Sequence, residues 1–412
     1  MLKRISVQQL RLGMYIKEFC GSWLDHPFWR NAFLLDNPAD LEALLASKIK
    51  EVWIDCDQGF DLASHENVVS LARNEAEIDS EMASTVSKKH VLARVSSDAE
   101  FSRAAKILGK SRQAVNSLFE EARMGQAVNA DNAQKLVEEI SNSVIRNPGA
   151  LISLARLKTA DDYTFMHSVA VCALMLALAR QLGLDETQCH SAGVAGLLHD
   201  LGKAAIPLEI LNKPGKLTDS EFAIIKTHPS AGHQMLLDGN GVNDIALDVV
   251  LHHHEKIDGS GYPDQLCDEQ ISLFAKMGAV CDVYDAITSN RPYKSGWDPA
   301  ESLSRMAEWS KGHFDNRVFQ AFVKSIGIYP IGSLVLLSCG RLGVVVEQGD
   351  KSLLQPQVKV FFSTRSNTRI LPEIIHIGQP GRSLRIVSRE DPEKWGIPDL
   401  NEIWSGLPDP RR

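Results

Sequence analysis

The sequence has few cysteines, and they follow no recognisable pattern. Its 412 residues include seven cysteines, at positions 20, 56, 172, 189, 267, 281 and 339, and no two of them form a Cys-x-x-Cys pair. An odd, scattered set argues against a disulfide framework and fits reduced thiols in a cytosol. The lack of paired cysteines also argues against a closed structural zinc site.

Long apolar segments are missing as well. The longest uninterrupted apolar run, Val169–Ala179, has eleven residues, whereas a membrane-spanning helix needs roughly 18–20. The N-terminal segment MLKRISVQQLRLGMY contains no apolar core followed by a small-residue cleavage site, so no signal peptide is predicted. We therefore expect a soluble, cytoplasmic protein without a membrane partner.

The chain also lacks an excess of positive charge. Its net charge of −8 gives no general attraction for nucleic acids or anionic membranes, so an anionic ligand would have to meet a local basic patch. No basic stripe or aromatic platform appears, which argues against a nucleic-acid polymer as partner. The apolar fraction of 44% and the charged fraction of 23% are ordinary for globular protein.

At this length two or three domains are expected. Near the N-terminus, Asp36-Asn37-Pro38 predicts a capped helix start, and apolar residues at 41, 44, 45 and 49 follow at helical spacing. Glu51–Ile54 then predicts a strand. The polar stretch 66–96 is predicted to be a linker or a solvated loop, and the helical pattern resumes near Ala99.

The middle of the chain is predicted to be helical and the end β-rich. One amphipathic helix carries Ala133, Val137, Ile140 and Val144 on its apolar face and ends before Asn147. Residues 150–326 continue as a helical domain. Beyond it, short strands are predicted at 335–337, 343–346 and 357–362.

Histidine and aspartate are concentrated in the helical region. Eight of the thirteen histidines lie between positions 167 and 254, around the dipeptide His199-Asp200. His167 shares an apolar helix face with residues 171, 174 and 178, so we expect it to point into the core; alone, it would be read as a hydrogen-bonded core residue. His199-Asp200 ends an apolar stretch, where an unpaired carboxylate would be costly to bury. Three consecutive histidines, 252–254, do not favour a helix.

Taken together, these residues predict a metal centre. Imidazole nitrogens and carboxylate oxygens suit iron, manganese or zinc. An aspartate that bridges two ions, with histidines completing each coordination sphere, suits the hydrolysis of a phosphate ester by a metal-activated water. Lys203 lies one turn beyond His199 and could neutralise a phosphate oxygen in the transition state, the alternative being a solvated surface lysine.

The ordered motifs carry a family resemblance. HDLGKAAIPLEILNKPGKLT begins at His199, and HHEKIDGSGYP, CDVYDAITSNRPYK and GHFD follow it. Across residues 160–330 the chain resembles the HD superfamily of metal-dependent phosphohydrolases and, within it, the HD-GYP branch, whose members hydrolyse cyclic di-GMP. The resemblance implies an all-helical HD-type bundle as the catalytic domain. Together with the strands and helix predicted on either side, the expected fold is mainly α, with a mixed α/β N-terminal domain and a small β-rich C-terminal appendage.

The resemblance also implies roles for individual residues. One divalent ion, iron or manganese, would be held by His167, His199, Asp200 and Asp282, and a second by Asp200, His228, His253 and His254. Asp200 and Lys203 would be catalytic. The loop of Gly259, Gly261, Tyr262 and Pro263 would approach the substrate through Gly261 and Tyr262, and Arg291 and Lys294 would bind its phosphate or guanine.

Two departures from the family pattern concern the site. Some members place a glutamate one turn before the first histidine, where it helps to hold a third metal ion; here that position is Tyr163, so we predict a dinuclear site. After Gly-Tyr-Pro the family continues with Gly-Leu and another glycine, whereas this chain has Gln265, Leu266 and Asp268.

The expected function is that of a cyclic di-GMP phosphodiesterase. A hydroxide bridging the two ions would open one phosphodiester bond to give pGpG, and further hydrolysis to GMP stays open. One alternative is an HD hydrolase of another nucleotide, and another is a cyclic di-GMP receptor with low turnover. The predicted domains are 1–130, regulatory or dimerising, with a homodimer or a signalling protein as partner; 131–330, catalytic; and 331–412, β-rich.

Overall fold

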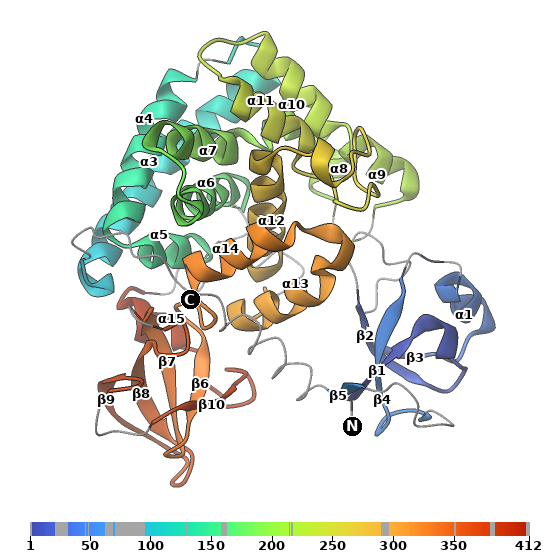
Figure 1. Ribbon diagram of the computed structural model, residues 1–412, viewed down its shortest axis with the longest axis vertical. Helices are drawn as coiled ribbons and strands as arrows, with labels where there is room; N and C mark the ends of the chain where they lie inside the picture. Colours follow the sequence, from blue (N-terminus) through green and yellow to red (C-terminus); the bar gives the residue numbers. More distant parts are fainter. Residues whose placement is uncertain are drawn as a thin grey trace. The chain divides into compact units, whose positions relative to one another are not determined.

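The computed structural model describes most of the chain and divides it into two compact units. The described residues are 2–20, 32–45, 47, 49–61, 69–70, 95–128, 130–157, 163–213, 215, 217–289, 296–349, 352–379 and 384–408. One unit comprises residues 1–84 and 304–311, and the other comprises 85–303 and 312–412. The first unit contains a small sheet, and the second contains most of the helices and another sheet (Figure 1).

The sheet of the first unit has five antiparallel strands in the order β3-β2-β4-β1-β5. The strands are β1 (Leu2–Ser6), β2 (Tyr15–Cys20), β3 (Phe33–Leu34), β4 (Glu51–Asp55) and β5 (Val69–Ser70), and the helices are η1 (Val7–Gln9) and α1 (Pro38–Leu45). Apolar side chains of these strands and of α1, including Ile16, Leu44 and Ile54, form one buried core. The pairing of β4 with both β1 and β2 places it in the centre of the sheet.

The predicted helix and strand near the N-terminus are confirmed. Helix α1 begins at Pro38, and Asn37 Oδ1 accepts a hydrogen bond from the Ala39 N–H at 3.0 Å. The helix ends at Leu45, so Ile49 lies after it and is buried in the core from a connecting segment. The predicted linker, 66–96, lies largely outside the described residues, but Val69–Ser70 within it pairs with β1.

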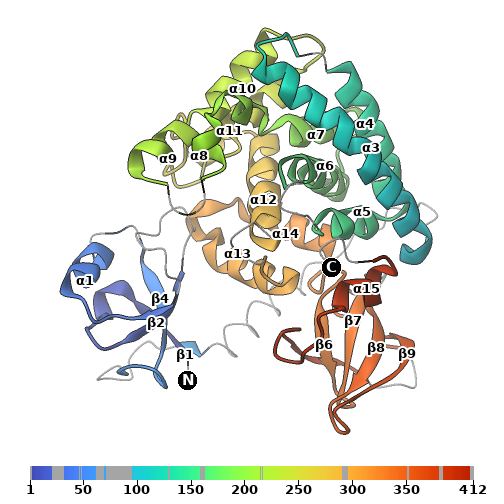
Figure 2. The same cartoon turned by 180° about the vertical axis from the view of Figure 1, so that it is seen from behind.

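The second unit is built mainly from helices. They are α3 (Ser97–Arg123), α4 (Asp131–Arg146), α5 (Pro148–Ala155), α6 (Tyr163–Leu182), α7 (Glu186–Leu198), η3 (Leu201–Ala205), α8 (Leu208–Leu211), α9 (Asp219–Ile225), α10 (His228–Leu237), α11 (Asp244–His252), η4 (Asp268–Gln270), α12 (Leu273–Thr288) and α14 (Asn316–Ile326). A further helix, α13 (Pro299–His313), is divided between the two units, since its residues 304–311 are assigned to the first. Helix α6 lies among α3, α5, α7 and α12 (Figures 1 and 2). The mainly helical fold class is confirmed.

Two local predictions in this unit are also confirmed. Helix α4 buries Ala133, Val137, Ile140 and Val144, the predicted face. It ends at Arg146 because Asn147 leaves the helical conformation and starts α5, where its side chain accepts a hydrogen bond from the Ala150 N–H at 3.2 Å. His167 points into the core as predicted, since it is buried in α6.

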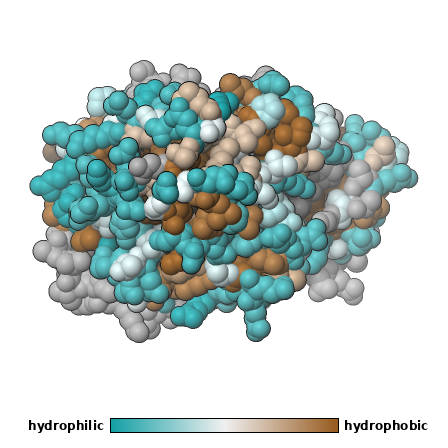
Figure 3. Space-filling model, turned by 90° about the horizontal axis from the view of Figure 1, so that it is seen from above, coloured by the Kyte–Doolittle hydropathy of each residue, from teal (hydrophilic) through white to brown (hydrophobic). Residues whose placement is uncertain are grey.

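Helix α6 is a core helix. Its segment Phe165–Leu182 is long and apolar enough to cross a membrane, and 83% of that segment is buried inside the structure. Burial against other helices supplies the apolar surroundings that this composition requires. The face drawn in Figure 3 is mostly hydrophilic, with apolar side chains in separate patches, which is typical of a soluble globular protein.

The chain ends in a second antiparallel sheet, of order β10-β6-β7-β8-β9. Its strands are β6 (Leu334–Leu337), β7 (Arg341–Glu347), β8 (Gln357–Ser363), β9 (Thr368–His376) and β10 (Ile386–Arg389), followed by α15 (Leu400–Ser405). The three predicted strands correspond to β6, β7 and β8. The edge strands β9 and β10 were not predicted, because most of their side chains are exposed or half-buried and show no apolar alternation.

Candidate metal centre

Seven side chains converge at one place in the helical unit. They form a first group, His167, His199 and Asp282, and a second group, Asp200, His228, His253 and His254; within each group the possible ligand atoms all lie within 4.8 Å of one another. These are the seven residues that the sequence predicted as metal ligands. They are buried, apart from His254, which is half-buried.

These residues lie in five helices or directly after them. His167 lies in α6, His199 and Asp200 follow α7, and His228 begins α10. His253 and His254 follow α11, and Asp282 lies in α12. Because α7 ends at Leu198 and a 3-10 turn begins at Leu201, Lys203 does not continue the face of α7 as the helical spacing predicted.

Two glycines allow η3 to pack directly on α10. A Cβ atom at Gly202 would lie 1.9 Å from the carbonyl oxygen of His228 and 2.4 Å from the nitrogen of Gly232. A Cβ atom at Gly232 would in turn lie 2.9 Å from the nitrogen of Gly202. Only residues without a side chain permit this approach. The contact carries Asp200, two residues before Gly202, to the side of His228.

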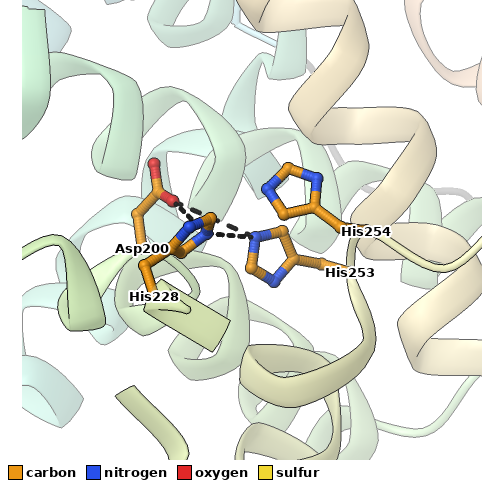
Figure 4. A group of neighbouring side chains, drawn as sticks. All are labelled: Asp200, His228, His253 and His254. Atoms are coloured by element: carbon orange, nitrogen blue, oxygen red, sulfur yellow. Dashed lines mark hydrogen bonds and ion pairs between the residues drawn. The ribbon is translucent and has the colours of Figure 1, made fainter. Parts of the chain in front are cut away.

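Asp200 lies between the two groups. Its Oδ2 atom is 3.3 Å from His167 Nε2 and 3.4 Å from His199 Nε2. Its Oδ1 atom is 3.3 Å from His228 Nε2 and 3.9 Å from His253 Nε2. Figure 4 draws the second group, in which both of these rings approach the Asp200 carboxylate. One carboxylate oxygen therefore faces each group of histidines.

Hydrogen bonds at Nδ1 fix the orientation of four imidazoles. His199 Nδ1 lies 2.9 Å from the Gly196 carbonyl oxygen, and His228 Nδ1 lies 2.8 Å from that of Ile225. His253 Nδ1 lies 3.1 Å from the carbonyl oxygens of Val249 and Val250, and His167 Nδ1 lies 2.6 Å from Asp285 Oδ2. Since carbonyl and carboxylate oxygens accept, Nδ1 carries a proton in these rings, and each ring offers the Nε2 lone pair to the centre once it is neutral.

The converging lone pairs fit a bound cation. His167 Nε2 and His199 Nε2 lie 3.1 Å apart, and His228 Nε2 and His253 Nε2 lie 3.4 Å apart. When the rings are neutral, these nitrogens carry no proton and cannot hydrogen bond to each other. Asp200 Oδ1 is buried and receives no hydrogen bond from any residue that the structure describes. A divalent cation near these atoms would satisfy all of them, so the donors present fit such an ion.

Burial and charge set the protonation of these donors. Burial, with help from neighbouring imidazoles, lowers the pKa of His253 to about 3 and that of His254 well below its usual value, so both rings are neutral. In His167 and His199 burial also opposes the charged form, but nearby carboxylates outweigh it and raise the pKa. Burial opposes ionisation of Asp200 too, yet the charges of Lys203 and His199 hold its pKa well below the ordinary value.

The glycine-containing loop lies against the second group. The Tyr262 ring stacks on the His254 ring with centroids 4.7 Å apart, and the Tyr262 N–H donates to the His254 carbonyl oxygen at 3.3 Å. Gly259 has a φ of +75°, which favours glycine. A Cβ atom at Gly261 would lie 2.5 Å from Glu255 Cα. The two glycines thus allow the loop to fold back on the segment that follows His254.

Of the remaining predicted site residues, the structure describes Lys203 but not all of the others. Lys203 Nζ lies 2.5 Å from Asp200 Oδ2, and its side chain is partly accessible. Arg291 and Lys294 lie outside the described residues, and so does the side chain of Tyr163. The contacts of Arg291 and Lys294 with a ligand stay predictions, and so does the dinuclear site that was predicted from Tyr163.

Two residues that were not predicted from the sequence, Asp285 and Glu255, support the centre. Of the three consecutive histidines 252–254, His252 does not belong to it. Asp285 binds His167 Nδ1; its spacing of three residues from Asp282 on α12 was the available signal. Glu255 accepts hydrogen bonds from three backbone N–H groups of the loop. His252 lies 2.7 Å from Asp248 and 3.1 Å from Asp264, away from Asp200.

The chain matches two protein families. Residues 140–318 match the HD domain family, and residues 2–133 match a domain of unknown function (DUF3391). The helical fold and the two groups of donors define an HD-domain protein.

Similar curated proteins narrow the family. The chain is 57% identical to the cyclic di-GMP phosphodiesterase PA4108 of Pseudomonas aeruginosa, over 99% of this chain and 96% of that protein. It is 38% identical to the cyclic di-GMP phosphodiesterase response regulator RpfG of Xanthomonas campestris, over 42% of this chain and 47% of that protein. It is 36% identical to the 3′3′-cGAMP-specific phosphodiesterase 1 of Vibrio cholerae, over 47% of this chain and 43% of that protein. The chain belongs to the HD-GYP family.

Proposed function

We propose that this protein is a phosphodiesterase that hydrolyses cyclic di-GMP to linear pGpG. The observation that carries the proposal is the position of Asp200, whose two oxygens each face a separate group of histidines. The substrate is supported by the relative that is 57% identical along nearly the whole length of both chains and is named a cyclic di-GMP phosphodiesterase. Further hydrolysis of pGpG would be detected by measuring GMP as a second product.

The cofactor we propose is a pair of divalent metal ions, iron or manganese. The first ion would be held by His167, His199 and Asp282, the second by His228, His253 and His254, with Asp200 between them. Such ions, when bound, acidify a water toward neutral pKa and offset the charge of a phosphate oxygen. The nitrogen-rich, thiolate-free donor set is consistent with iron or manganese. The two groups of donors support a dinuclear site.

Side chains around the ions would orient and neutralise the phosphodiester. Lys203, with an accessible ammonium beside Asp200, would stabilise negative charge that develops on a phosphate oxygen. Gly261 and Tyr262 would approach the substrate from the loop. Arg291 and Lys294 would bind phosphate or guanine, because guanidinium and ammonium groups are the usual partners of phosphate.

We also propose how the remaining parts serve this activity. The catalytic domain would occupy residues 131–330, with a regulatory or dimerising domain at 1–130 and a β-rich region at 331–412. A homodimer or a signalling protein would then act through the N-terminal domain. The protein would work in the cytoplasm, where cyclic di-GMP is available.

One assay tests the activity and the metal together. Protein loaded anaerobically with Fe²⁺ or Mn²⁺ is incubated with cyclic di-GMP, and the products are resolved by chromatography while metal content is measured in parallel. We expect pGpG and two metal equivalents per chain. The Asp200→Ala variant should keep its helical circular dichroism and lose hydrolysis. An unchanged rate in that variant would remove the proposed role of Asp200.

Two rivals are separated by the same assay. An HD hydrolase of another nucleotide would share the metal donors, and a relative at 36% identity is named 3′3′-cGAMP-specific; a panel with this and other cyclic nucleotides compares kcat/KM directly. A receptor with low turnover would bind cyclic di-GMP tightly and give no product on metal-loaded protein.

A further inference from the structure

The orientation of His254 differs from that of the other histidines in the centre. His167, His199, His228 and His253 each have Nδ1 within hydrogen-bond distance of a carboxylate or carbonyl oxygen. The His254 ring has no such bond to any residue that the structure describes, and its Nδ1 is 3.8 Å from Asp282 Oδ2. In Figure 4 dashed lines join His228 and His253 to the group, but none reaches His254.

Ring contacts hold His254 instead. Its centroid lies 4.1 Å from that of His253, 5.0 Å from that of His228 and 4.7 Å from that of Tyr262. The first two rings belong to the second group, so among the described residues Tyr262 supplies the ring contact that comes from outside it. The Tyr262 and His254 planes meet at 27°, a stacked arrangement. Stacking restricts rotation of the imidazole about its side-chain bonds.

Tyr262 is itself held in place by Glu255. The Glu255 carboxylate is buried and accepts the N–H groups of Asp264 at 2.7 Å and Gln265 at 2.9 Å through Oε1, and that of Leu266 at 3.1 Å through Oε2. These three residues begin two positions after Tyr262. Glu255 follows His254 directly in the chain, so one short segment supplies both the imidazole and the anchor for the loop that covers it.

We propose that Glu255 and Tyr262 are positioning residues for the second metal ion. Glu255 fixes the loop, the loop presses the Tyr262 ring against His254, and the stacked imidazole is kept turned toward the second group. This contact takes the place of the hydrogen bond that orients each of the other four imidazoles. The inference rests on the proposed dinuclear centre, and it assigns to the tyrosine a role in metal affinity besides contact with substrate.

Mn²⁺ binding to the full-length, metal-free protein tests the proposal, because it is measured without turnover. Titration followed by electron paramagnetic resonance should give two equivalents for the parent chain. Removal of an orienting partner of a metal ligand typically weakens binding by about 10- to 100-fold. We expect this loss for one equivalent in Tyr262→Ala and in Glu255→Gln, whose amide cannot accept from all three N–H groups. Tyr262→Phe, which keeps the ring, should bind both equivalents as the parent does.

The same Tyr262 substitutions, made in a protein that also carries His199→Ala, show which ion is affected. His199→Ala removes a donor of the first group, so the equivalent that remains reports on the second group. Adding Tyr262→Ala there should abolish that equivalent at the concentration used, while adding Tyr262→Phe should leave it. If Glu255→Gln loses its helical circular dichroism, the Tyr262 pair still decides the matter.

The other outcomes are also informative. Equal affinity for both ions in Tyr262→Ala and in the parent would overturn the inference, and so would equal weakening of both equivalents. A parent chain that binds fewer than two ions would instead overturn the proposed dinuclear centre.

Discussion

The Nδ1 atom of His167 lies 2.6 Å from Oδ2 of Asp285, and both side chains are buried. This contact turns His167 Nε2 toward Asp282 Oδ1, 3.1 Å away, and toward Asp200. Asp285 therefore supports the first group without facing its centre. Carboxylates in this position orient a histidine and raise its basicity as a ligand.

Replacement of this carboxylate should weaken one metal ion selectively. We expect Asp285→Asn to lower the affinity of the first group by about 10- to 100-fold, because the amide can turn its NH₂ toward Nδ1 and favour the wrong tautomer. Metal content after dialysis against a chelator measures the effect. Retention of both ions at parental affinity would show that Asp285 is not needed to orient His167.

Metal binding should depend on pH through the first group. Carboxylates raise the pKa of His167 and His199 against the effect of burial, so these rings keep a proton above the usual range of histidine in the metal-free protein. A cation must displace these protons, and its affinity should fall as pH is lowered. The second group should respond less, because burial holds the pKa of His253 near 3 and lowers that of His254.

Two measurements check this pH dependence. Titration of Mn²⁺ at pH 6, 7 and 8 should show one equivalent weakening more steeply than the other towards acid. Calorimetry in buffers of different ionisation enthalpy should show proton release on binding of that equivalent. Equal pH slopes for both ions would contradict the assignment of the titrating protons to the first group.

A methyl group at position 261 should disturb the loop. In Gly261→Ala the new Cβ would lie 2.5 Å from Glu255 Cα and from Lys256 N, both backbone atoms that cannot give way. We expect a loss of about 1–3 kcal/mol in unfolding free energy, typical of overpacking, together with a large loss of hydrolysis. Urea unfolding and the hydrolysis assay measure the two effects.

The matched control for this variant is Ser260→Ala. The exposed Ser260 hydroxyl donates to Asp258 Oδ1 at 2.6 Å, and its removal creates no overlap. We expect stability within about 0.5 kcal/mol of the parent, as for most surface substitutions. A Gly261→Ala variant as active as Ser260→Ala would show that the close approach is dispensable.

Glu100 and Arg146 form an ion pair that lies far from the metal donors in sequence. Glu100 is fully buried and accepts hydrogen bonds from Arg146 at 2.7 and 2.9 Å and from Ser143 at 2.9 Å. Glu100→Gln should reduce the free energy of unfolding by about 1–3 kcal/mol, since charged hydrogen bonds are lost while Arg146, one-third exposed, can still reach water. Lys110→Ala, which removes an exposed pair with Glu139, should cost less than about 1 kcal/mol.

The pKa of Glu100 also predicts how the contribution of this ion pair to stability changes with pH. Burial opposes ionisation of Glu100, but its hydrogen bonds with Arg146 and Ser143 lower its pKa in the folded protein. A carboxylate with a lowered folded pKa stabilises the fold above its unfolded pKa and loses that contribution as pH falls through the folded value. The stability difference between parent and Glu100→Gln should therefore shrink on acidification, as urea unfolding at several pH values can measure.

Much of the fold and the centre could be predicted from the sequence because the signals were local. The cap before Pro38, the helix end before Asn147, the apolar periodicity in α4 and α6 and the short apolar segments of β6–β8 depend on neighbouring residues. The candidate ligands were also found locally, since an aspartate after an apolar helix and adjacent histidines are costly without a partner. The edge strands β9 and β10 gave no such signal, since little of their surface is buried.

The sequence by itself determined that the middle of the chain is helical, which side chains are candidate metal ligands and, through its family motifs, the class of reaction. Only the tertiary structure decided which of these groups meet. Consecutive residues point in different directions, so His253 approaches Asp200 while His252 turns to Asp248 and Asp264. Asp285 acquires its partner His167 from packing between distant helices, and a linear sequence does not specify such a contact because it depends on how helices meet in space. Glu255 acquires its partners because the loop folds back on the segment after His254.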